Sequence, residues 1–184
     1  MTATSAPFGL RPVYHPSGQI NLETLDAGIA SAYGTAIYSG TPVKWDTNGT
    51  IIPCTTGADT ALGVFAGCQF TYAQRRFVLP YWPAAQTYDT GSMSCQIIMD
   101  PQVIYEVQAN GAVAITARGE AMNLANTSQG SIYTGQSTQA AAATTTGATP
   151  GLMTVEGIAP YPNNEWGDAY TIVRVRLTQQ APVA

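Results

Sequence analysis

The segment YDTGS, residues 88–92, is the one stretch of this sequence that matches a catalytic motif. Asp-Thr-Gly is typical of aspartic proteases, in which two carboxylates share one proton, so that one acts as base and the other as acid. In those enzymes apolar strand residues precede the aspartate, whereas the run Gln-Thr-Tyr precedes Asp89 here. Asp and Gly also begin and end turns. We therefore interpret residues 88–92 as a turn, with an acid protease centred on Asp89 as the enzymatic alternative.

Other catalytic and metal-binding patterns are missing from the sequence. His15 is the only histidine and no G-x-S-x-G segment occurs, which argues against a serine triad and against a metal site built on histidines. Neither of the glycine-rich phosphate-binding fingerprints is present. The cysteines, Cys54, Cys68 and Cys95, lack C-x-x-C spacing, so they favour buried free thiols over a zinc site or a disulfide framework. We expect no enzymatic activity, no cofactor and no metal.

The charge of the chain narrows the choice of partners. The 184 residues carry a formal net charge of −4, and only 10% of them are charged. Lys44 is the single lysine and Arg75-Arg76 the only adjacent basic pair, which argues against nucleic acid, because Lys and Arg neutralise its phosphates. A neutral polar surface suits packing against other subunits, where desolvating charges is costly. Without a signal-peptide pattern or a long apolar run, we expect cytoplasmic synthesis and no membrane association.

Strand-like patterns run through most of the chain and predict an all-β fold. Strand-forming residues flank the turn DTNG, residues 46–49, and predict a hairpin. Residues 61–72 alternate small and large apolar side chains around glycines, which predicts a bent or bulged strand. Pro80 and Pro83 confine the strand around them to a sheet edge. Residues 93–99 and 103–107 each place apolar side chains on one face by strict alternation.

The C-terminal half is less regular. Residues 112–125 are the one segment where we consider a short helix, and the low-complexity residues 138–150 predict a surface loop. In the last strand, residues 172–177, the apolar side chains face one way while Arg174 and Arg176 face the other, which makes the arginines candidate subunit contacts. The sum predicts one β-barrel or β-sandwich domain over residues 21–184.

An extended arm, residues 1–20, precedes this domain. Its prolines, at positions 7, 12 and 16, fix φ and remove backbone donors, so neither a helix nor a central strand can run through it. Its apolar side chains are too many for a free tail and require a cover. We predict that residues 2–20 clamp a neighbouring subunit, where Arg11 donates to a carboxylate. The predicted partner-binding residues are Phe8, Leu10, Arg11, Val13 and Tyr14.

Several structural phrases of the chain resemble a group of tailed-bacteriophage virion proteins. The phrases are APFGLRPVYHPSG, YGTAIYSGTPVKW and LGVFAGCQFTY, then YWP and, before the last strand, NNEWG. The proteins they resemble are capsid cement (head decoration) proteins, which bind the outside of a shell built from the major capsid protein. The resemblance implies a β-barrel, β-tulip or jelly-roll fold, a homotrimer, the major capsid protein as partner, a place on the outer surface of the virion, and capsid stabilisation as the function.

Two binding modules remain as alternatives. One is another β-module of a virion, such as a tail or fibre subunit that binds a receptor. The other is a carbohydrate-binding module, because three tryptophans and ten tyrosines offer aromatic platforms on which sugars stack. The structural interpretation of the tryptophans puts Trp45 in the core and makes Trp82 and Trp166 candidate subunit contacts.

Overall fold

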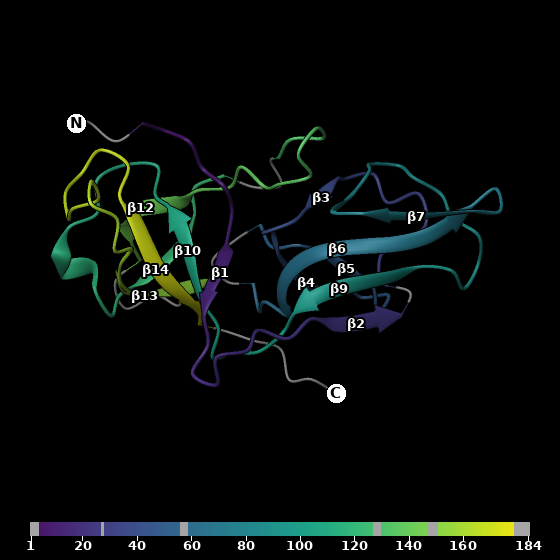
Figure 1. Ribbon diagram of the computed structural model, residues 1–184, viewed down its shortest axis with the longest axis horizontal. Helices are drawn as coiled ribbons and strands as arrows, with labels where there is room; N and C mark the ends of the chain where they lie inside the picture. The colour runs from purple at the N-terminus through teal and green to yellow at the C-terminus, as the bar shows by residue number, and fades with distance from the viewer. Residues whose placement is uncertain (1–3, 27, 56–58, 127–129, 147–150, 179–184) are drawn as a thin grey trace.

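β-strands account for nearly all regular structure in the computed structural model, which describes residues 4–26, 28–55, 59–126, 130–146 and 151–178. The named strands pair antiparallel in three sheets, none of which closes into a barrel within the described residues. The all-β prediction is therefore confirmed. Figure 1 shows the two larger sheets side by side, sheet A on the left and sheet B on the right.

Sheet A joins the N-terminal segment to the C-terminal half of the chain. Its strands lie in the order β1 (Arg11–Tyr14), β10 (Ile104–Gln108), β14 (Ile172–Leu177), β13 (Met153–Ile158), β11 (Ala121–Leu124), β12 (Ala141–Thr145). Strand β1 forms one edge and pairs with β10, which is distant in sequence. The edge position fits Pro12, because proline cannot donate a hydrogen bond to a second neighbouring strand.

Sheet B contains the strands from the first half of the chain. Its main path is β2 (Glu23–Asp26), β9 (Ser94–Ile98), β6 (Gly63–Tyr72), β4 (Pro42–Trp45), β5 (Ile51–Pro53), and β7 (Arg75–Leu79) pairs with β6 off that path. Strands β3 (Ile37–Tyr38) and β8 (Tyr81–Trp82) form the two-stranded sheet C. The predicted hairpin around residues 46–49 is confirmed as β4–β5, and the predicted bulge as a register shift in β6 between Phe65 and Gly67.

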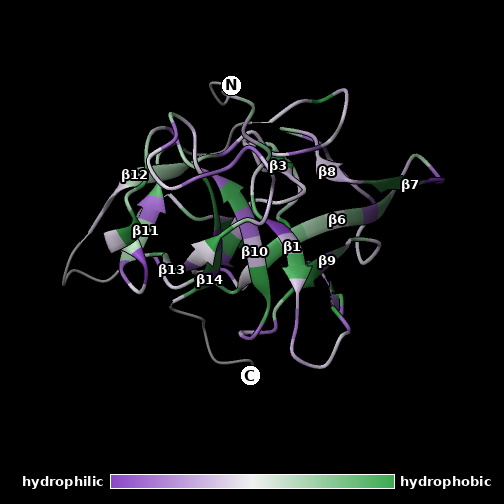
Figure 2. Ribbon diagram, turned by 60° about the vertical axis from the view of Figure 1, so that its left-hand side comes forward, coloured by the Kyte–Doolittle hydropathy of each residue, from purple (hydrophilic) through white to green (hydrophobic). Residues whose placement is uncertain are grey.

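Two hydrophobic clusters form the core, and strict alternation decides which residues enter each. Tyr105 and Val107 of β10 lie in the cluster under sheet A, together with the alternating apolar residues of β14, Val173, Val175 and Leu177. Met93, Cys95, Ile97 and Met99 lie in the cluster under sheet B, as their alternation predicts. Ile98, between them, points to the other face and joins the cluster of sheet A. In Figure 2 the hydrophobic colour is concentrated in such strands and the hydrophilic colour in the connecting loops.

Two predictions of secondary structure are wrong. The segment 112–125 is not a helix: a 3-10 turn covers Ile115–Ala117, Gly119 then takes a φ of +83°, and β11 pairs with β13 and β12. The surface loop predicted over 138–150 is instead strand β12 at residues 141–145, and 147–150 lie outside the described residues. The amide side chains of Asn126 and Asn110 accept hydrogen bonds from Ala140 N at 2.7 Å and Ala143 N at 2.9 Å, which helps hold this small-residue segment in the sheet.

Gly63 provides a test of how closely the strands of sheet B approach. A Cβ atom added there would overlap the carbonyl oxygen of Ile98 and lie 2.9 Å from Cγ2 of Ile97. We expect Gly63→Ala to lower the free energy of unfolding by about 1–3 kcal/mol, because backbone on the neighbouring strand must move. The measurement is urea denaturation. Gly34→Ala, where an added Cβ meets nothing within 4 Å, is the control and should change the free energy of unfolding by less than about 0.5 kcal/mol. Equal effects of the two substitutions would contradict the close approach of the strands at Gly63.

Candidate functional site

The first part of the arm lies on its own chain. Backbone hydrogen bonds join Gly9 N to Gln139 O at 3.1 Å and Leu10 N to Gly40 O at 2.9 Å, and β1 continues this contact along β10. The side chain of Leu10 is 1% exposed and belongs to the cluster under sheet A. The prediction that neither a helix nor a central strand runs through the arm is confirmed for residues 4–20, since β1 is an edge strand.

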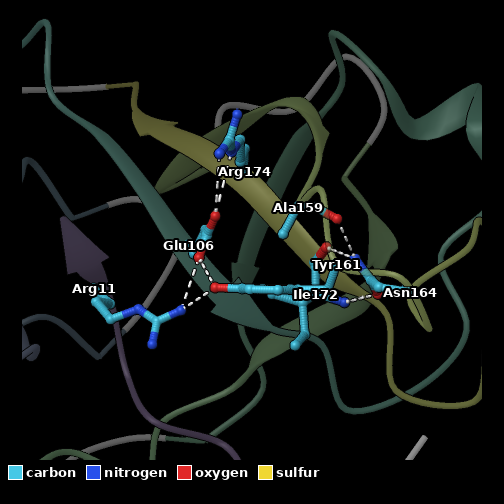
Figure 3. Close-up of polar contacts among 7 residues, drawn as sticks. All are labelled: Arg11, Glu106, Ala159, Tyr161, Asn164, Ile172 and Arg174. Carbon is cyan, nitrogen blue, oxygen red and sulfur yellow. Dashed lines mark hydrogen bonds and ion pairs between the residues drawn. The ribbon is translucent and has the colours of Figure 1, made fainter. Parts of the chain in front are cut away.

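Glu106, on β10, collects the polar contacts of the arm. Its carboxylate is 3% exposed and accepts hydrogen bonds from Arg11 Nη2 at 2.8 Å and from the Tyr161 hydroxyl at 2.6 Å. Arg174, on the adjacent β14, donates to its second oxygen from Nε and Nη2, both at 3.3 Å. Arg11 also donates to the Tyr161 oxygen. Figure 3 shows the two guanidinium groups reaching the carboxylate from opposite sides.

The loop after β13 is fixed so that Tyr161 can reach this carboxylate. Asn164 donates from its amide to the carbonyl oxygens of Ala159 at 2.9 Å and Ile172 at 2.8 Å, and it accepts from Ile172 N at 2.9 Å. One side chain thus ties both ends of the loop together, as Figure 3 shows. We name Arg11, Glu106, Tyr161 and Arg174 the Glu106 cluster.

The contacts within the Glu106 cluster favour the charged forms of Glu106 and Arg11. Burial works to raise the pKa of Glu106, but the hydrogen bonds from Tyr161, Arg11 and Arg174 outweigh it and leave that pKa lowered. The same contacts raise the pKa of Arg11, chiefly through its hydrogen bond to Glu106, and that of Tyr161. The arrangement is a structural ion-pair network that fastens the arm, because Arg11, Arg174 and Tyr161 all donate to one carboxylate.

A second polar contact lies where β1 ends. His15 Nε2 lies 3.0 Å from Asp100 Oδ2, and its Nδ1 contacts the Ser17 hydroxyl at 2.6 Å. A hollow of about 560 Å³ lies beside this pair and is bordered by Met99 and Gln102. The arm is therefore fastened to β10 at Glu106 and to the turn before β10 at Asp100.

The predicted partner-binding residues divide into covered and exposed ones. Leu10 is buried, while Phe8 and Val13 are half-buried, with the Arg11 guanidinium 4.8 Å from the centre of the Phe8 ring. Tyr14 is 52% exposed. The prediction for Arg11 needs correction: its carboxylate partner, Glu106, lies in the same chain, since β1 pairs with β10 and brings the two side chains together.

The candidate subunit contacts also divide. Trp82 is fully buried between Phe70 and Tyr88, so its assignment to a subunit contact is wrong. The assignment of Trp45 to the core is also wrong, because its side chain is 41% exposed at the end of β4. Trp166 is half-buried beside Arg118, whose guanidinium lies 5.9 Å from its ring centre. Arg174 and Arg176 do lie opposite the apolar face of β14, and they pair with Glu106 and Glu156.

Sequence reasoning did not identify Glu106, Tyr161 or Asn164 as members of a site. A signal was present for Glu106, because it stands between Tyr105 and Val107 in an alternating strand and must face away from the apolar side. The arginines of the last strand face the same side of their own strand. Only the pairing of β10 with β14, which puts Glu106 opposite Arg174, joins the two observations.

The motif with catalytic resemblance, residues 88–92, forms the predicted turn. Ser92 N donates to Asp89 O at 3.1 Å, and Gly91 has a φ of +76°. The described residues contain no group of three or more His, Cys, Asp or Glu side chains placed to hold a metal ion. Burial raises the pKa of the Cys54 and Cys68 thiols to about 12 and that of Cys95 further, so these free thiols stay protonated at neutral pH.

Comparisons of the chain with protein families, with curated proteins and with solved structures found no match. Within the described part of the chain, no helix has the length and apolar composition needed to cross a membrane.

The Glu106 cluster predicts a pH-dependent stability. We expect Glu106→Gln to lower the free energy of unfolding at pH 7 by about 1–3 kcal/mol, because two arginines lose their shared carboxylate. Since the folded-state pKa of Glu106 is lowered, its contribution is fully present above the ordinary carboxyl pKa and is lost as the pH falls through the lowered value. Urea denaturation from pH 7 to pH 2 should therefore show the gap between the two proteins closing on the acid side.

Glu156→Gln is the matched control. Its ion pair with Arg176 spans 3.3 Å, but both side chains are about 40% exposed, so we expect a loss below about 0.5 kcal/mol. A Glu106→Gln loss no larger than that of the control would contradict the role of Glu106 as the fastening point of the arm.

Proposed function

We propose that this protein is a capsid cement protein of a tailed bacteriophage, which binds the outer surface of the shell and stabilises contacts between capsomers. Its partner is the major capsid protein, and it acts as a homotrimer made in the cytoplasm of the host. The finer fold that we propose with this role is a β-sandwich of sheets A and B. It acts by binding, without turning over a substrate.

One observation carries the proposal: residues 14–22, the end of the arm and the two residues after it, display apolar side chains to solvent while the residues before them are fastened. Tyr14, Ile20 and Leu22 are 52%, 37% and 51% exposed. They lie within nine residues, and the segment begins where the His15–Asp100 pair and β1 hold the chain. Exposed aromatic and aliphatic side chains on one short segment offer anchors of the kind that bind another protein.

The composition of the chain supports a role in assembly. Only 10% of the residues are charged, so burying the surface against a shell desolvates few charges. Every bound copy stabilises the assembled shell relative to its separate subunits by mass action. A segment whose neighbouring residues are already ordered also loses less conformational entropy on binding than a free tail would.

The test of the proposal removes the exposed side chains and leaves the fastening contacts intact. We expect the triple variant Tyr14→Ser, Ile20→Ser, Leu22→Ser to fold normally and to sediment with shells of the major capsid protein at least about tenfold more weakly than the unchanged protein, because most of the energy of an interface comes from a few apolar anchors. Deleting the whole arm is a poorer test, since it would also remove Leu10 from the core.

The matched control places the same loss of apolar surface elsewhere. Ile115, Ile132 and Tyr133 are 60%, 58% and 93% exposed and lie outside the arm. Changing all three to Ser should leave sedimentation with shells unchanged. Full shell binding by the arm variant, or equal loss with the control, would overturn the proposal.

A further inference from the structure

Two edge strands of sheet B, β2 at one end of its main path and β7 beside β6, have no second strand partner among the described residues. Strand β2 pairs only with β9, and β7 pairs only with β6, among the described residues. Each step from β2 through β9 and β6 to β7 is antiparallel. Strands β2 and β7 therefore point in opposite directions, as their arrows do in Figure 1. A β2 strand from a second copy, placed beside β7 in the same orientation of the sheet, would continue the antiparallel pattern.

The edge of β7 carries Arg75 and Arg76, which have no carboxylate or aromatic ring as partner among the described residues. Arg75 and Arg76 are exposed, and Arg76 Nη2 donates a hydrogen bond to Gln69 Oε1 at 2.5 Å. The other Lys and Arg side chains have partners. Arg11 and Arg174 form ion pairs with Glu106, Lys44 with Asp59 and Arg176 with Glu156, and Arg118 lies over the ring of Trp166. On a chain of net charge −4, this edge is a local positive spot.

The edge of β2 carries the opposite charge. Glu23 and Asp26 are both exposed, and neither lies within 4.0 Å of a cation among the described residues. The two edges of one sheet thus hold two free cations and two free anions. Opposite charges that face each other across paired strands stabilise the pairing, whereas like charges oppose it.

Apolar side chains at the two edges match as well. Phe77 of β7 and Leu25 of β2 are each partly buried against the cluster under sheet B, at its opposite ends. Because neighbouring side chains on a strand alternate in direction, Arg76 and Val78 share the outer face of the sheet with Thr24 and Asp26. Phe77 and Leu25 share the inner face.

The tip of the β6–β7 hairpin is held in shape by the turn at residues 89–92. Asp89 N donates to Thr71 O at 2.8 Å, Thr71 N donates to the Ser92 hydroxyl at 3.0 Å, and Gln74 N contacts Asp89 Oδ2 at 3.5 Å. Ala73 and Gln74 both have positive φ, 49° and 64°, which non-glycine residues rarely adopt without such support. The Asp-Thr-Gly-Ser motif therefore braces the tip of the β6–β7 hairpin, from which β7 starts.

We propose that sheet B binds a second copy of the same chain through these two edges, with β2 of one copy added to β7 of the next. The pairing is antiparallel and sets Arg76 opposite Asp26, Phe77 opposite Leu25 and Val78 opposite Thr24. Because the two edges differ, the contact is head to tail, and it closes into a ring when the rotation per subunit allows. This inference takes only the homotrimer from the proposed function. Its test uses the isolated protein, without shells.

A charge exchange tests the pairing. We expect Arg76→Asp alone and Asp26→Arg alone each to weaken self-association at least about tenfold, because each places like charges opposite one another. The double variant, Arg76→Asp with Asp26→Arg, restores the opposite charges and should recover most of the association. Analytical ultracentrifugation over a concentration series, with native mass spectrometry, measures it. Thr47→Asp with Thr116→Asp, two exposed positions, is the control with the same net charge as Arg76→Asp and should associate like the unchanged protein.

Three results would overturn the inference. The unchanged chain could stay monomeric up to about 1 mM, where even an association worth about 4 kcal/mol would be visible. Arg76→Asp could strengthen association, which would show that the edge arginines prevent pairing. The double variant could also fail to recover. Sedimentation of the Arg76→Asp variant with shells, measured separately, distinguishes a failed edge contact from a failed capsid role, since the arm residues are unchanged in it.

Discussion

A single buried carboxylate determines where the N-terminal arm lies. Glu106 is 3% exposed, and an ionised group so far from water requires partners that compensate its lost hydration. It finds them in Arg11 from the arm, in Arg174 from the last strand and in Tyr161 from the loop between the last two strands. The two ends of the described chain are thereby joined at one point of β10. The exposed part of the arm can then start from a fixed position.

The arm therefore combines two properties that a clamp needs. Its first part, through Leu10 and β1, is integral to sheet A, and its next part, from Tyr14 to Leu22, leaves apolar side chains uncovered. A wholly free arm would pay the full entropic cost of ordering when it binds, and a wholly covered arm would have nothing to offer a partner. The sequence alone predicts residues 2–20 as one clamp. The structure divides them at about the end of β1.

Local pattern predicted much of the fold and little of the site. Alternation in residues 93–99 and 172–177 assigned the buried faces, because the period of a strand fixes which side chains share a face. Alternation could not assign Trp45 and Trp82 to the core or to the surface, since strand propensity does not say which end of a strand leaves the core. The Ala- and Thr-rich β12 has no apolar alternation, and amide side chains distant in sequence hold it. The Glu106 cluster joins residues 95 and 68 positions apart, which only sheet register brings together.

The central claim is that the segment from Tyr14 to Leu22 contacts the major capsid protein on the outside of the shell. The most direct measurement places a photo-crosslinking amino acid at Ile20, which is 37% exposed, in protein bound to intact phage heads, and identifies the crosslinked peptides by mass spectrometry. The account predicts crosslinks to the major capsid protein, with this protein present in the heads at a copy number comparable to that of the shell subunit. Crosslinks confined to its own chain, or absence of the protein from the heads, would contradict it.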